Sequence, residues 1–149
     1  MVGGQRRQMR VLLIEDSLAD VEFTRDAVVQ SGLPVELDVL RDGEGAMSLI
    51  TSLGLDASVP RPDLVLLDLN LPRVDGWAVQ DAVRSSDDES VRSIPVVVLT
   101  TSRAEQDVAR VYEAGANSFV TKPMRIDEFA KAIRIIIGNF WLGTTRRPD

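Results

Sequence analysis

The sequence contains neither cysteine nor histidine among its 149 residues. Without cysteine, the protein can form no disulfide and no thiolate metal site, which fits the reducing environment of the cytoplasm. Without histidine, it lacks the commonest general base, the usual zinc ligand and any phosphohistidine intermediate. If the protein accepts a phosphoryl group, the acceptor must therefore be another type of residue.

Long hydrophobic runs and an excess of positive charge are also missing. The basic N-terminal residues are followed only by a strand-length apolar run, residues 11–14, which ends in two acids. This is not the pattern of a signal peptide, and no stretch is long enough to span a membrane. The formal net charge of −6 disfavours nucleic-acid binding. We therefore expect a cytoplasmic protein with neither a nucleic-acid nor a membrane partner.

The chain length predicts one domain. We expect it over residues 10–142, with a flexible N-terminal tail over 1–9 and a C-terminal tail over 143–149 and no output domain. Apolar runs and turn residues predict strands at 10–15, 35–40, 64–67, 96–99 and 118–121. Helical patterns and capping residues predict helices at 17–30, 42–53, 76–85, 104–114 and 126–142.

Strands and helices that alternate five times predict an α/β fold with a doubly wound parallel sheet. The runs 64–67 and 96–99 show no polar alternation, so both of their faces should be covered by helices. The run 35–40 does alternate, as expected for a strand at the edge of a sheet. The flavodoxin-like (βα)5 order 2-1-3-4-5 is the best fit for five strands.

Polar residues follow four of these strands, at the edge where open α/β sheets place their ligands. They are Glu15, Asp16, Asp68, Thr100 and Lys122. Each alone is explained by a turn or a helix cap, but three neighbouring carboxylates repel one another and require a counter-ion. Mg²⁺ accepts carboxylate oxygens and bridges to phosphate. The nucleophile available here is a carboxylate, and carboxylates form acyl phosphates.

These residues and their neighbours together form a specific pattern. It consists of Glu15-Asp16, Asp68-Leu69-Asn70-Leu71-Pro72, Asp75-Gly76, Thr100 and Lys122-Pro123. In this order the motifs resemble the receiver domain of two-component response regulators, over about residues 10–140. The resemblance implies that a sensor histidine kinase phosphorylates Asp68.

The resemblance also assigns roles to the other residues of the pattern. Asp16, Asp68 and the backbone carbonyl of Asn70 would bind Mg²⁺ directly, and Glu15 would assist through a water molecule. Thr100 and Lys122 would bind the phosphoryl oxygens.

Two further features of the pattern concern strand 118–121 and the residues after it. Phe119 occupies the place of the family's rotating aromatic residue, and the Lys122-Pro123 bond would be cis. A phosphoryl group on Asp68 would draw Thr100 inward, and this movement would vacate space that Phe119 then fills. Simple core packing is the alternative explanation for Phe119, and packing beside the site explains Trp77.

Softer markers are similar to the small single-domain regulators that partner bacterial phytochromes. They are the loop before residue 64, the long 85–94 connection, the run 99–102 and Phe140-Trp141-Leu142. This resemblance implies a phytochrome-type kinase as partner. The polar run 85–90 is otherwise interpreted as a solvated loop.

Two other functional classes were weighed. A phosphatase with an aspartyl nucleophile, of the haloacid dehalogenase type, needs a second acid two residues after Asp68, where this chain has Asn70. A flavin carrier needs a Ser/Thr/Gly-rich loop where this chain has Glu15-Asp16. Within the receiver family, a phosphate sink or an intermediate carrier is an alternative to a signalling output.

The last predicted helix suggests self-association. Ile126, Phe129, Ala130, Ile133, Ile136, Ile137 and Phe140 form one apolar stripe toward the sheet. Ile135 and Leu142 lie on the opposite side, with Trp141 at the margin, and an apolar surface left in water suggests a partner. The expected face of a symmetric homodimer is made of Val108, Val111, Tyr112, Ile135, Trp141 and Leu142. The alternative is that Trp141 folds back onto the domain.

Overall fold

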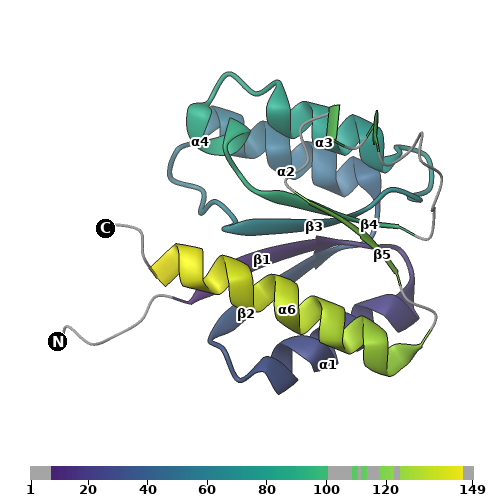
Figure 1. The fold of residues 1–149 in the computed structure, drawn as a ribbon. Coiled ribbons are helices and arrows are strands. Elements are labelled where there is room, and N and C mark those ends of the chain that lie inside the picture. Colours follow the sequence, from purple (N-terminus) through teal and green to yellow (C-terminus); the bar gives the residue numbers. More distant parts are fainter. Residues whose placement is uncertain (1–7, 101–108, 111, 114–117, 123–124, 146–149) are drawn as a thin grey trace, which may run out of the picture.

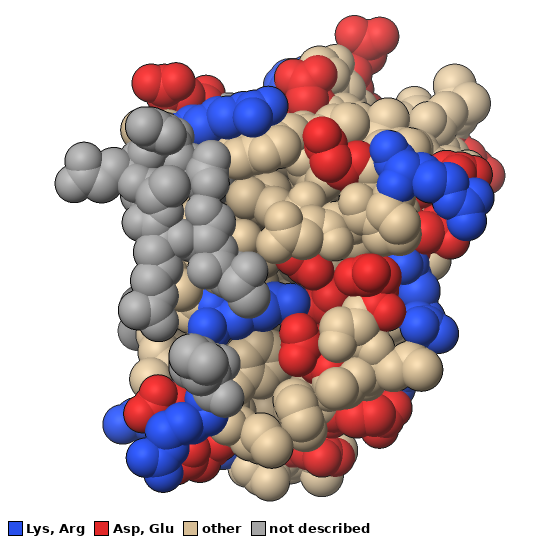
Figure 2. Space-filling model, turned by 90° about the vertical axis from the view of Figure 1, so that its right-hand side faces the viewer, with Lys and Arg blue, Asp and Glu red and all other residues tan. Residues whose placement is uncertain are grey.

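The computed structural model describes residues 8–100, 109–110, 112–113, 118–122 and 125–145. Its five parallel strands form one sheet in the order β2-β1-β3-β4-β5, which confirms the predicted flavodoxin-like arrangement. Figure 1 shows three layers, with α1 and α6 on one face of the sheet and α2, α3 and α4 on the other. The carboxyl ends of the strands point to the right in Figure 1, and Figure 2 shows this face.

The strands are β1 Met9–Ile14, β2 Val35–Leu40, β3 Leu64–Asp68, β4 Val96–Thr100 and β5 Ser118–Thr121. Every residue of β3 and β4 is buried, because helices cover both faces of these central strands. The edge strand β2 is only partly buried, as its alternating sequence predicted. In the register, Ile14 pairs with Leu67 and Asp68 pairs with Leu99, so β1, β3 and β4 end at the same level.

The helices are α1 Leu18–Ser31, α2 Gly43–Leu55, α3 Gly76–Arg84, α4 Glu89–Arg92 and α6 Ile126–Thr145. Of the predicted helix 104–114, the structure describes only helical residues 109–110 and 112–113. The side chains of Ser17, Asp42 and Asp75 each accept a hydrogen bond from the backbone two or three residues inside the helix that follows. No helix in the described part of the chain has the length and apolar character needed to cross a bilayer.

Two apolar clusters, one on each face of the sheet, hold the layers together. Because side chains alternate along a strand, Leu12 and Ile14 of β1 face α2 and α3, whereas Val11 and Leu13 face α1 and α6. Adjacent strands contribute in the same way. The core therefore fixes which side of the sheet each helix packs against.

Helix α6 follows the predicted apolar stripe with two corrections. Trp141 is only 4% exposed and belongs to the same buried apolar cluster as Met9 and Ile137, so its expected place in a dimer face is wrong. It follows Ile137 by one helical turn and therefore shares the inward face. Ile126, which was expected to cover the sheet, is the first residue of the helix and is 58% exposed. Ile135 is 54% exposed, on the outer side as expected.

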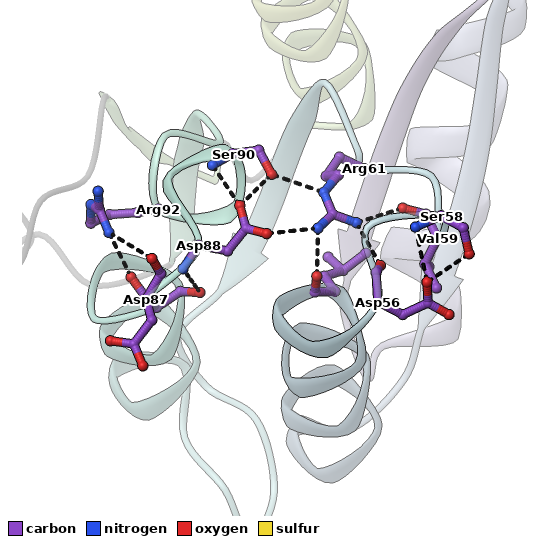
Figure 3. Close-up of polar contacts among 10 residues, drawn as sticks. Asp56, Ser58, Val59, Arg61, Asp87, Asp88, Ser90 and Arg92 are labelled. Carbon is purple, nitrogen blue, oxygen red and sulfur yellow. Dashed lines mark hydrogen bonds and ion pairs between the residues drawn. The ribbon is translucent and has the colours of Figure 1, made fainter.

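The segment 85–90 is mostly exposed, as its interpretation as a solvated loop predicted, but it also makes long-range contacts. Asp88 caps the short helix α4 and pairs with Arg61 at 3.1 Å, and Ser90 Oγ accepts a bond from Arg61 Nε at 2.9 Å (Figure 3). The same guanidinium donates to the backbone carbonyls of Leu53, Asp56 and Val59. Arg61 thus joins the end of α2, the loop before β3 and the start of α4.

Replacing Arg61 by Ala should lower the free energy of unfolding by about 2–3 kcal/mol, because it removes charge-assisted hydrogen bonds to groups that are partly shielded from water. Arg61→Lys should recover little of this loss, since a single ammonium group cannot donate to all the acceptors that lie around the planar guanidinium. Urea denaturation followed by circular dichroism measures both values.

The matched control is Arg25→Ala, because Arg25 makes one exposed contact to Glu22 at 3.8 Å. It should change the free energy of unfolding by less than about 0.5 kcal/mol. Equal losses in the Arg25 and Arg61 variants would contradict the role given to Arg61.

Candidate functional site

The carboxyl ends of β1, β3, β4 and β5 bring the predicted polar residues to one edge of the sheet. Glu15 directly follows β1, Asp68 ends β3, Thr100 ends β4 and Lys122 directly follows β5. Parallel strands in register share an edge, so residues far apart in the sequence become neighbours here. On this face, Figure 2 shows acidic side chains gathered beside a basic one.

Three carboxylates form the centre of the site. Oxygen atoms of Glu15, Asp16 and Asp68 lie within 4.8 Å of one another. Glu15 and Asp68 are buried, at 1% and 4% exposure, whereas Asp16 is more accessible. A set of carboxylate oxygens that is buried on one side and open on the other suits a small hard cation that keeps part of its water shell. The residues present therefore fit the predicted Mg²⁺ site.

The backbone around these acids holds them in position. The amide of Asn70 donates to Asp68 Oδ1 at 3.0 Å, and the amide of Ser17 donates to Glu15 Oε2 at 3.2 Å. Arg41 donates to the carbonyl oxygen of Asp16 at 3.2 Å. Glu15 and Asp68 thus each accept a hydrogen bond on the carboxylate, and Asp16 accepts one on its backbone carbonyl. These bonds hold the three residues in position.

Lys122 is the basic group of the site, with a side chain only 9% exposed. Its Nζ forms an ion pair with Glu15, another with Asp20 at 2.8 Å, and a longer contact with Asp68 Oδ2 at 3.5 Å. Its backbone amide donates to the carbonyl oxygen of Thr100 at 2.8 Å. The ammonium group is therefore held beside Asp68 but closer to two other acids.

Burial has the largest single effect on the pKa values of Glu15 and Lys122. It raises the pKa of Glu15 to about 8, a hydrogen bond with Asp68 acts in the same direction, and Lys122 opposes both. Burial alone would lower the pKa of Lys122, but its bonds to Asp20 and Glu15 and the nearby charges raise this pKa overall. Burial thus favours the neutral form of Glu15, whereas the ion pair with Lys122 favours its charged form.

The loop after β3 is packed tightly against the start of α3. The Gly76 amide donates to the carbonyl of Leu69 at 3.2 Å. A Cβ atom at Gly76 would lie 2.6 Å from the Asp68 carbonyl oxygen and 2.7 Å from Leu69 Cα, so no side chain fits there. Trp77 comes next, packs against the core and lies under the guanidinium of Arg110, 4.1 Å from the ring centroid.

The other predicted residues are distributed as follows. Thr100 is 1% exposed, and Phe119 is half-buried against the cluster on the α2 and α3 side of the sheet. Asn70 is exposed at the start of the loop. Pro123, and with it the predicted cis bond to Lys122, lies outside the described residues.

The expected dimer face is only partly described. Tyr112 is 52% exposed, similar to Ile135. Val108 and Val111 lie outside the described residues, as does the side chain of Leu142. The roles assigned to the residues of the pocket and of this face stay predictions.

Asp20 is the pocket residue that the sequence reasoning missed. It lies in the first turn of α1, where an acid is normally explained by the helix dipole. Its Oδ2 instead accepts a bond from Lys122 Nζ at 2.8 Å. The available signal was its position four residues after Asp16, since the first turn of the helix that follows β1 rises from the same edge of the sheet.

The known proteins that resemble this chain are response regulators. The response regulator receiver domain model matches residues 11–134. Response regulator Rcp1 of Synechocystis sp. is 41% identical over 93% of this chain and 92% of its own length. The polar-differentiation response regulator DivK of Brucella anthropi is 30% identical, over 87% of this chain and 96% of its own.

Solved structures agree with the sequence matches. The phosphorylated cyanobacterial phytochrome response regulator RcpA superposes with a TM-score of 0.82 and 36% identity, over 96% of this chain and all of its own. The Mn²⁺-bound form of Rcp1 gives 0.79 and 39%, over 95% and 99% of the two chains. The chain therefore belongs to the receiver domain family of response regulators and is related to the response regulator Rcp1 and the phytochrome response regulator RcpA.

Proposed function

We propose that this protein accepts a phosphoryl group on Asp68 from a sensor histidine kinase, in a reaction that depends on Mg²⁺, and passes the signal on through protein contacts. The observation that carries the proposal is the convergence of one ammonium group and two further carboxylates, those of Glu15 and Asp16, on Asp68. Asp68 itself ends a fully buried strand. The strand holds the Asp68 carboxylate in one position at the carboxyl edge of the sheet, where it can act as a nucleophile.

The proposed transfer makes one bond and breaks one. An oxygen of the Asp68 carboxylate forms the new bond to phosphorus, while the bond from phosphorus to the donor breaks and its electron pair leaves with the donor group. Lys122 stabilises the negative charge on the transferred oxygens, and Thr100 supplies a hydroxyl donor. With acetyl phosphate as donor, the leaving group is acetate.

Asp16, Asp68 and the carbonyl of Asn70 would hold the cation directly, with Glu15 assisting. When bound, Mg²⁺ supplies positive charge that reduces the repulsion between the acids and the incoming phosphoryl group. The chain's own contribution is to hold the acids at fixed positions before binding, through the local bonds of Ser17, Asn70 and Arg41.

A phytochrome-type kinase is the proposed donor. Support comes from the likeness to Rcp1 and RcpA, the second of which is described as a phytochrome response regulator. We place the reaction in the cytoplasm, which fits a chain without cysteine. A role as phosphate sink or carrier uses the same chemistry. The phosphatase alternative is disfavoured because Asn70 stands where that mechanism needs an acid.

Replacing Asp68 by Asn should abolish labelling of the protein by radioactive acetyl phosphate in the presence of magnesium, because the amide cannot act as the nucleophile. Asp38→Asn, an exposed aspartate on the edge strand, is the control and should be labelled like the wild type. Equal labelling of the Asp68→Asn protein would contradict the assignment. Omission of magnesium should also prevent labelling of the wild type.

We further propose that phosphorylation draws Thr100 inward and that Phe119 then repacks. Thr100 ends β4, and Phe119 lies on the neighbouring strand β5, in register with Val98. A hydrogen bond made at one strand can therefore bias a packing choice on the next.

Thr100→Ala should still be phosphorylated but should lose the conformational response, whereas Thr100→Ser, which keeps the hydroxyl, should retain it. Amide chemical shifts of β5 and residues 109–113, compared before and after phosphorylation, measure the response. If the Ala variant and the wild type show the same shift changes, Thr100 is not the switch.

Homodimerisation through a face that contains Tyr112 and Ile135 remains part of the proposal. Both side chains are more than half exposed, and such apolar surface favours a partner. Trp141 is withdrawn from this face because it is buried. A two-fold dimer is the commonest assembly for a small protein.

The test is sedimentation of the wild type and of an Ile135→Glu, Leu142→Glu double variant at tens of micromolar. We expect a dimer for the wild type and a monomer for the variant, because two buried charges at a symmetric interface are strongly unfavourable. Asp127→Asn, an exposed change near the start of the same helix, is the control. A monomeric wild type, or an equally dimeric variant, would rule this face out.

A further inference from the structure

Asp20 adds a fourth carboxylate to the pocket, and its contacts differ from those of the other three. Its Oδ2 lies 2.8 Å from Lys122 Nζ, whereas the nearest Asp68 oxygen lies 3.5 Å from the same nitrogen. Among the described residues, the acids grouped closely enough to share a cation are Glu15, Asp16 and Asp68, and Asp20 is not one of them. Asp20 therefore acts on the lysine and not on the candidate cation site.

Helix α1 holds Asp20 in place. Its amide donates to the Ser17 side chain at 3.3 Å, and its carbonyl accepts a bond from Thr24 Oγ1 at 2.8 Å. Thr24 is 1% exposed, and α1 packs along α6. Lys122, by contrast, has a long flexible side chain with three donor hydrogens. When the two must separate, the lysine is the partner that moves.

The chemistry of the site requires such a movement. A phosphoryl group on Asp68 presents three oxygen acceptors next to an ammonium group that is already bonded to Glu15 and Asp20. Two of its three N–H groups are bonded to Glu15 and Asp20, so Lys122 can donate to more than one of the phosphoryl oxygens only by exchanging one of these two bonds. The acid that is not needed for the cation, Asp20, is the one whose bond can be exchanged without disturbing the cation site.

We propose that Asp20 is a positioning residue that holds Lys122 back from Asp68 and competes with the phosphoryl group for its ammonium. This inference rests on the proposed function of Asp68. The competition lowers the affinity of the pocket for a phosphoryl group and sets a threshold for activation, so that weak donors do not drive the domain into its phosphorylated form.

The experiment measures, by calorimetry on the intact chain, the affinity for beryllofluoride, a mimic of the phosphoryl group, with magnesium present. Asp20→Asn should bind it about tenfold more tightly than the wild type, because one charge-assisted hydrogen bond no longer has to be given up. Asp20→Glu, which keeps the charge, should stay within about threefold of the wild type. Asp26→Asn, on the same helix and exposed, is the matched control and should match the wild type.

A second measurement separates positioning from structural damage. The same variants are titrated with magnesium alone, where Asp20→Asn should bind the same or slightly more weakly, by less than about fivefold, since it removes a nearby negative charge. A damaged pocket would weaken both affinities together. Asp20→Ser, which a first helical turn tolerates, repeats the test if the Asn variant unfolds more easily in urea.

The outcomes are distinct. Unchanged or weaker beryllofluoride binding by Asp20→Asn and Asp20→Ser, with normal binding and labelling of the wild type, would overturn the role of Asp20 alone. Tighter binding by Asp26→Asn as well would overturn it too, because a general loss of negative charge would then explain the effect. Absence of binding and labelling in the wild type would overturn the proposed function together with this inference.

Discussion

The ion pairing of one buried ammonium group with buried carboxylates governs the arrangement of the pocket. Lys122 follows the last strand of the sheet and meets Glu15, which follows the first strand in sequence. Charges placed this far from water are stable only when they are paired. The pairing thus requires β1, β3 and β5 to end at one level, and the sheet order and register provide this.

Much of the fold and the centre of the site followed from the sequence, for physical reasons. Four-residue apolar runs such as 64–67 are typical of strands that are covered on both faces in a parallel sheet, and parallel strands gather whatever follows them at one edge. Glu15, Asp68 and Lys122 therefore had to meet once the strands were identified. The sequence marks each strand by a short local pattern, and the sheet topology brings the polar residues after these strands to one site.

The contacts that the sequence did not predict depend on how far a side chain extends and on the direction in which it points. Arg61 bonds to three backbone carbonyls and to the side chains of Asp88 and Ser90, and no local pattern encodes such partners. Asp20 looks like an ordinary helix-start acid until the position of Lys122 is known. Trp141 stood at the margin of the apolar stripe, and its burial in the cluster that contains Met9 of β1 shows only in the folded protein.

The contact between Gly76 and the backbone of Asp68 and Leu69 leaves no free space between the end of β3 and the start of α3. A single additional carbon would not fit on this side, so the start of α3 forms a rigid wall behind the loop. A displacement of the loop toward α3 is therefore possible only if the helix moves with it. A closely packed glycine thus couples the end of the central strand to the helix that follows it.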